Sequence, residues 1–234
     1  MKEKTKQRLR MFLVNRGVLA ACVLATAFVL PVQWCMRGSG AWYRGEAKVQ
    51  ERLARGVMRW IEGEEAANIS ADAFATGHDL FDGEWQFGTY FAAAMGLGQT
   101  ALEHPEWRER HSALMAECIR HMLSDRVCAF DTEAWRGQSA MEDLEDGLVG
   151  HAAYLGYMNL AMSLHRVVDP GSEFAELNDR ITSALMQSLM ASPQGLLPTY
   201  PGEFYPVDNC SVGGSIGLHG KGTGRDYSDF MAAW

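Results

Sequence analysis

Apolar residues recur with a helical period along much of the chain. Between Ala41 and Glu62 they stand at every fourth position, at Val49, Leu53, Val57 and Ile61. Because an α-helix brings residues four apart onto one side, this spacing predicts an amphipathic surface helix with a single apolar stripe.

Three later segments, near residues 84–103, 147–168 and 212–219, are apolar or small on nearly every side, so we expect buried helices. One-sided amphipathic segments near 105–124 and 172–191 follow the first two. The buried helices are expected to begin near residues 84, 147 and 211, at intervals of 63 and 64 residues, and no segment has the pattern of a long alternating strand. This alternation predicts an all-α protein, built as an array of helical hairpins or an (α/α) toroid.

A closed ring takes more hairpins than the three that the pattern supplies after a lone leading helix. We therefore expect an incomplete ring. The sequence also stops at Trp234 within an apolar run and without a polar cap, which favours a fragment truncated at its C-terminus.

The first residues have the pattern of an export signal. Residues 1–16 hold six Lys and Arg against one Glu, and residues 17–32 carry no charge. A cleaved signal peptide and a retained membrane anchor both remain open, although the bulky Gln33, Trp34 and Arg37 favour the anchor. Since the positive charges precede the apolar run, the protein body is expected outside the cytoplasm, on the periplasmic or extracellular side.

Three parts are expected: residues 1–36 as the basic start with the signal or anchor, 37–81 as a leading helix and loop, and 82–234 as the helical-hairpin domain. After residue 16 the chain has 15 Lys and Arg against 28 Asp and Glu, a net charge of −13, which argues against nucleic acid as a partner. The expected partners are a small-molecule substrate and, through the N-terminal segment, a membrane. Homo-oligomerisation and the pairing of five cysteines stay open.

The stretch from Leu196 to Ser211 is where we expect chemistry. Its three prolines, at 198, 201 and 206, restrict the backbone and predict a stiff loop over the helical core. A rigid loop of this kind often carries an active site. Its polar and reactive residues are Tyr200, Glu203, Tyr205, Asp208, Asn209 and Cys210. The alternative is a proline-rich connection whose tyrosines only cover the core.

A histidine stands among small residues at the start of the second buried segment. His151 can face a cavity there, with Tyr154 and Tyr157 on or near the same side, and an imidazole exchanges protons near neutral pH. The alternative is a hydrogen-bonded core histidine. The acidic run at residues 142–146 is interpreted as a favourable charge before a helix start. Of Asp82 and Glu84, one is expected to cap a helix and the other to face the cavity.

In their order and spacing, residues over roughly 82–234 resemble the family of linalool dehydratase-isomerase. The resemblance is carried by Gly96, Leu97, Pro105, Gly150, His151, Tyr154, Leu155, Tyr157, Leu160, Tyr205, Val207, Ser211, Val212, Asp226, Tyr227 and Trp234. It implies an exported enzyme with an (α/α)6 toroid and a cavity role for His151. In that family a cysteine pair on the loop also lines the cavity. Here its first position holds Tyr200 and its second falls on Asn209 or Cys210, so the specific alkenol chemistry does not follow.

The resulting hypothesis is a lyase or isomerase that dehydrates or isomerises a small alcohol or isoprenoid-like molecule, without metal or organic cofactor. The expected catalytic residues are His151, Asp208 and Cys210. The expected substrate-binding residues are Tyr90, Tyr154, Tyr157, Tyr200, Glu203, Tyr205 and Asn209. One alternative is a glycosidase or sugar epimerase that uses Glu203 and Asp208 as its carboxyl pair. The other is an envelope scaffold without activity, in which the three catalytic candidates are all buried apart from one another and share no cavity.

Overall fold

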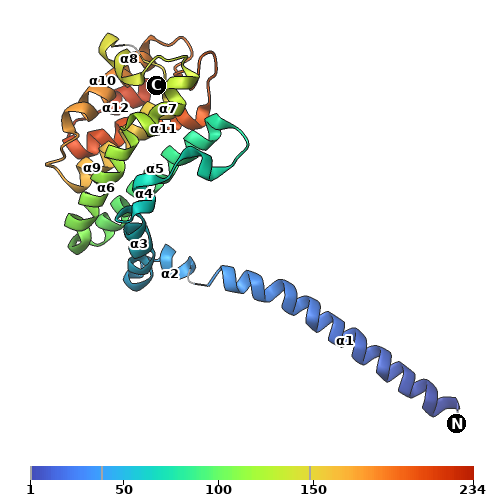
Figure 1. Cartoon of the computed structure of the whole chain (residues 1–234). Helices are drawn as coiled ribbons and strands as arrows, with labels where there is room; N and C mark the ends of the chain where they lie inside the picture. The colour runs from blue at the N-terminus through green and yellow to red at the C-terminus, as the bar shows by residue number, and fades with distance from the viewer. Residues whose placement is uncertain (1, 38, 148) are drawn as a thin grey trace. The chain divides into compact units, whose positions relative to one another are not determined.

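The regular structure of the chain is helical throughout the described residues. The computed structural model describes residues 2–37, 39–147 and 149–234, and within these ranges it contains no strand (Figure 1). An isolated antiparallel bridge joins Tyr200 to Glu203. The all-α prediction is confirmed. The chain divides into two compact units, Met1–Glu51 and Arg52–Trp234.

The first unit contains a long N-terminal helix. Helix α1 (Lys2–Cys35) is followed by the short α2 (Ser39–Tyr43) and by the first residues of α3 (Ala47–Ile61). Among the described residues, one helical span, Val14–Tyr43, is long and apolar enough to cross a membrane, and none of its most apolar window is buried. An exposed apolar N-terminal helix is therefore present, as a signal sequence or an anchor requires.

The second unit holds the rest of α3 and the remaining helices. In chain order they are α4 (Glu64–Asn68), the 3₁₀ helix η1 (Ala71–Phe74), α5 (Asp79–Glu103), the 3₁₀ helix η2 (Pro105–Trp107), α6 (Arg108–Met122), α7 (Asp125–Ala134), α8 (Ala140–Asp146), the π-helical turn η3 (Ala152–Gly156), α9 (Tyr157–Val168), α10 (Ala175–Ala191), α11 (Pro206–Thr223) and α12 (Ser228–Ala233).

Helix α9 lies at the centre of this unit. It packs against α5, α6, α10 and α11, while α6 also packs against α5, and α10 against α11. Buried side chains such as Met158, Met162 and Leu164 fill the spaces between these helices. The expectation that this segment is buried nearly all round is confirmed.

Helices α5 and α11 differ from the expectation of burial on every side. Within the two predicted segments, Trp85 of α5 is 61% exposed, and Gly214 and Gly217 of α11 are exposed. Small and apolar composition does not separate a helix enclosed by neighbours from one with an open side, so this part of the prediction was wrong. The stripe predicted on α3 holds in part: Ile61 is buried and Val57 is half-buried, but Leu53 is exposed, and Ala54 and Met58 are buried in its place.

The start of α11 lies earlier in the chain than expected. The helix begins at Pro206, where the missing amide hydrogen of proline costs no intrahelical bond. Asp208, Asn209 and Cys210 therefore lie in its first turns and not on a stiff loop. The loop prediction holds only up to Tyr205.

A close approach and a polar network join the central helix to its neighbours. At Gly156 a Cβ atom would lie 2.5 Å from Ser211 Oγ and 2.9 Å from a methyl group of Val212, so glycine is required where η3 meets α11. The buried Asn159 of α9 donates from Nδ2 to Thr182 Oγ1 at 3.0 Å and to Ser215 Oγ at 2.8 Å. These bonds link α9 to α10 and α11.

Candidate functional site

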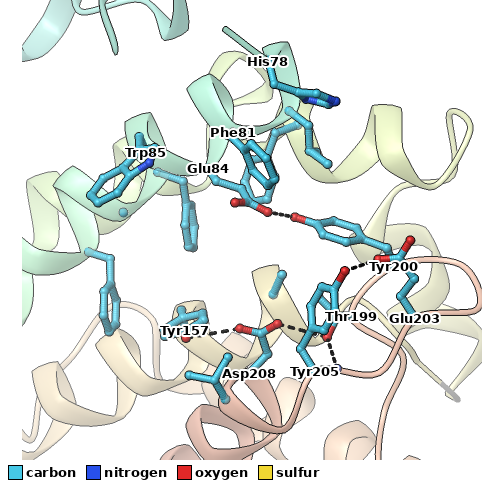
Figure 2. A pocket seen from close by; sticks show the side chains of 17 residues that line it. His78, Phe81, Glu84, Trp85, Tyr157, Thr199, Tyr200, Glu203, Tyr205 and Asp208 are labelled. Atoms are coloured by element: carbon cyan, nitrogen blue, oxygen red, sulfur yellow. Dashed lines mark hydrogen bonds between the residues drawn. The ribbon is translucent and has the colours of Figure 1, made fainter. Parts of the chain in front are cut away.

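A pocket of about 640 Å³ opens where the first turns of α5, η3 with α9, and α11 come together. Figure 2 shows its lining. The residues that line it are His78, Leu80, Phe81, Glu84, Trp85, Phe87, Gly88, Phe91, Phe130, Ala153, Tyr157, Thr199, Tyr200, Glu203, Tyr205, Val207 and Asp208. Its lining is mainly aromatic. Its few polar groups are mainly carboxyl groups and the hydroxyl groups that bond to them.

Glu84 projects into the pocket from α5. Its Oε1 accepts a hydrogen bond from the hydroxyl of Tyr200, which comes from the loop before α11 (Figure 2). Burial raises the pKa of Glu84, and the negative charge of Asp208 adds to the rise against the opposing effect of the tyrosine bond. Burial and the bond to Glu84 also raise the pKa of Tyr200, so that phenol stays neutral.

Asp208 enters from the opposite side of the pocket, in the first turn of α11 (Figure 2). Its Oδ1 accepts from the hydroxyl of Tyr157 at 3.2 Å, and its Oδ2 accepts from Thr199 Oγ1 at 3.0 Å. Burial and the neighbouring carboxylate raise the pKa of Tyr157 to about 12. Two donors from different segments therefore fix both oxygens of this carboxyl group.

The loop before α11 is held by a tight turn. Thr199 N donates to the carbonyl of Glu203 at 2.8 Å, and Glu203 N donates to the carbonyl of Tyr200 at 2.9 Å. Thr199 Oγ1 accepts from Tyr205 N at 3.1 Å, and the hydroxyl of Tyr205 donates to the Glu203 carboxyl group. This turn places Tyr200 against Glu84 on α5.

The exposed residues that line the pocket are His78, Glu203 and four apolar or aromatic residues, and the latter four form its apolar mouth. Phe81 and Trp85 come from α5, and Tyr205 and Val207 from the start of α11, with exposed fractions between 45% and 65%. We call these four the mouth residues. No Lys or Arg is among the residues that line the pocket.

His151 lies outside the pocket lining and is completely buried. Its Nδ1 is 2.6 Å from Asp131 Oδ2 and its Nε2 is 3.0 Å from Asp143 Oδ2, while the ring stacks on Trp135 with centroids 4.1 Å apart. Burial raises the pKa of Asp131, and its bond to His151 opposes that rise. Both ring nitrogens are thus occupied by carboxyl groups. The backbone of His151 is left-handed, with φ at 56°.

Asp143 belongs to the acidic run that was interpreted as preceding a helix. The run instead forms part of α8 itself, which Ser139 caps from its N-terminus. Only Asp143 reaches back to His151, so the interpretation by helix dipole missed this contact.

The remaining candidates lie away from the pocket. The hydroxyls of Tyr90 and Tyr154 donate to the carbonyls of Ala66 and Met122, and both rings are buried. The amide of Asn209 bonds the backbone of Leu197, which holds the loop to α11. Cys210 is exposed. None of the five cysteines forms a disulfide.

The structure therefore brings together Tyr157, Tyr200, Glu203, Tyr205 and Asp208, and it does not bring together His151, Asp208 and Cys210. The scaffold interpretation expects such a separation, but it also expects all three residues to be buried, and Cys210 is exposed. The pocket instead collects a different pair, Glu84 and Asp208.

Residue spacing on α5 could have predicted which of its residues line the pocket. Phe81, Glu84, Gly88 and Phe91 are spaced at three or four residues and lie on one side of the helix. Of Asp82 and Glu84, Glu84 is the residue that faces the pocket. The expected cap was wrong: α5 begins at Asp79, with His78 as its N-cap, and Asp82 lies buried inside the helix and accepts from Thr76 N at 2.7 Å. Within the described part of the chain no three His, Cys, Asp or Glu residues are grouped to hold a metal ion.

Comparison of the chain with family models, with curated proteins and with solved structures found no match.

Proposed function

We propose that the pocket binds a small, mostly apolar alcohol and removes or moves its hydroxyl group by acid–base catalysis, as a lyase or isomerase. One observation carries the proposal: two carboxyl groups, Glu84 and Asp208, enter a single aromatic pocket from opposite sides. Each of them is bonded to a tyrosine hydroxyl.

Glu84 is the acid in this proposal. Because its raised pKa keeps the carboxyl group protonated to higher pH, it can donate that proton to the hydroxyl of a substrate. The C–O bond then breaks and water leaves. The aromatic faces of Trp85 and Tyr157 stabilise the cation that remains, each by about 0.5 to 2 kcal/mol.

Asp208 is the base. It takes a proton from the carbon next to the cation, and the electrons of that C–H bond form the new double bond. The proton returns to Glu84 through water, so the alcohol becomes an alkene and one water molecule. In the isomerase reaction, water adds to the other end of the allylic cation and gives up one proton to Asp208, which leaves the isomeric alcohol. His151 has no direct part in these steps, because Asp131 and Asp143 occupy both of its ring nitrogens.

The packing supports a helical-hairpin origin for this pocket. Helices α5, α9 and α11 would be the inner helices of an (α/α) toroid, with α6 and α10 packed behind them as outer helices. This arrangement agrees with the resemblance to the family of linalool dehydratase-isomerase. The basic residues before the apolar span support a body on the outer side of a membrane.

The test is turnover of a panel of tertiary and allylic alcohols by the full chain in detergent micelles, with products identified by gas chromatography and mass spectrometry. We expect Glu84→Gln and Asp208→Asn each to lower kcat by about 10² to 10⁴-fold. The matched control is Glu176→Gln, which removes an exposed carboxyl group from α10. Retained activity in Glu84→Gln would remove the acid from the mechanism.

A carbohydrate-active enzyme is the second candidate, and the exposed indole of Trp85 at the mouth favours it, because sugars stack on such rings. Glu203 and Asp208 would then be the carboxyl pair. Hydrolysis or epimerisation of oligosaccharides, lost in both Glu203→Gln and Asp208→Asn, would replace the first proposal with this one. No turnover of either substrate class would favour the scaffold.

A further inference from the structure

The mouth residues form an exposed apolar surface around the entrance of the pocket. Trp85 and Val207 are 61% and 65% exposed, and Phe81 and Tyr205 are 49% and 45% exposed. Isolated exposed apolar side chains need no explanation, but these four line one pocket and come from two different helix starts. Such a surface is energetically unfavourable in water and indicates a contact with something apolar.

The same chain carries a helix that is long and apolar enough to cross a membrane. Wherever such a span is retained, it holds the rest of the chain close to a bilayer. Tryptophan and tyrosine are also the side chains that settle at the boundary between lipid and water, since each has an apolar body and a polar tip.

We propose that the mouth residues insert into the surface of the lipid bilayer, so that the pocket opens toward the membrane and takes its substrate from the lipid phase. The contact is apolar and not electrostatic. The ionisable side chains that face the pocket are His78, Glu84, Glu203 and Asp208, with no Lys or Arg to attract anionic headgroups. Uncharged phosphatidylcholine surfaces are therefore sufficient.

The experiment places a photoreactive benzophenone amino acid in place of Val207 in the full chain, held in phosphatidylcholine nanodiscs. The matched control has the same group in place of Met190 on α10, which is 63% exposed and does not line the pocket. After illumination, lipid adducts are counted by mass spectrometry. We expect a several-fold excess of lipid adduct at position 207, unchanged in high salt and reduced several-fold by Phe81→Ser with Trp85→Ser.

Equal labelling at the two positions, or no lipid adduct at position 207, overturns the proposal. So does a cross-link from position 207 to another polypeptide, which would make the mouth a protein interface. A requirement for anionic lipid, or loss of the adduct in high salt, would also contradict an apolar contact. The proposal is also contradicted if the chain is released from the membrane and does not bind to added vesicles. The adduct forms without turnover, so this result is independent of the alcohol chemistry.

Discussion

Replacing His151 with alanine should strongly destabilise the protein. The imidazole lies between Asp131, which is 1% exposed, and Asp143, which is 13% exposed at its side chain. Removing it leaves a buried carboxyl group without its partner, and breaking a buried pair in this way costs about 3 to 5 kcal/mol. For a unit of this size, each 1 kcal/mol lowers Tm by roughly 2 to 4 °C, so we expect a fall of about 6 to 20 °C.

The measurement is urea unfolding of the full chain in detergent, followed by far-ultraviolet circular dichroism, together with a thermal scan. The His151→Ala variant is compared with His78→Ala, in which an exposed histidine is removed. The double variant His151→Ala with Asp131→Asn removes the unpaired charge as well. It should recover part of the loss, about 0.5 to 3 kcal/mol, because residues in direct contact couple by that amount.

A loss below about 1 kcal/mol in His151→Ala would refute the reasoning, since the pair could then not stabilise the buried carboxyl group as described. A double variant less stable than either single variant would refute it too. It would mean that Asp131 stabilises the fold through some contact other than the imidazole.

Three further predictions follow from the packing and the titrating groups. Gly156→Ala should destabilise the protein by about 1 to 3 kcal/mol in urea unfolding, because the added Cβ meets the side chain and backbone of Val212. Gly96 has open space around it, so Gly96→Ala should stabilise the protein by about 0.5 to 1 kcal/mol. Asn159→Ala should cost about 1 to 3 kcal/mol for each buried partner left without a bond, and a neutral result would contradict the network. Burial lowers the pKa of His165, so as the pH falls the unfolded chain binds this proton before the folded protein does. The free energy of unfolding should therefore fall as the pH drops below about 6.5. The His165→Gln variant should show a smaller fall when unfolding is measured from about pH 7 to about pH 5.

Helical periodicity predicted those parts of the fold where one side of a helix faces the core. The apolar face of α10, with Ile181, Leu185 and Leu189 buried, lies where the spacing placed it. Positions of glycine and alanine predicted less well which sides of a helix are buried. They permit close packing on any side of a helix, so they could not indicate that α5 and α11 each leave one side open.

The candidate site was predicted in part, because the proline-rich stretch restricts its own backbone. Tyr200, Glu203 and Asp208 all line the pocket, and local sequence was enough to single them out. Glu84 was not paired with Tyr200, which stands 116 residues further along the chain. The partners of His151 were missed for the same reason, since only the packing of α7 and α8 brings their carboxyl groups to the ring.

The enclosure of α9 by four helices also determines which unfolding event exposes its backbone to solvent. Amide hydrogens on α9 cannot meet solvent until the surrounding helices separate, so they should exchange with deuterium only through global unfolding. The walls of the pocket rest on this helix through Tyr157 and on the adjoining turn through Ala153. The pocket and the native state should therefore be lost together, at the same urea concentration.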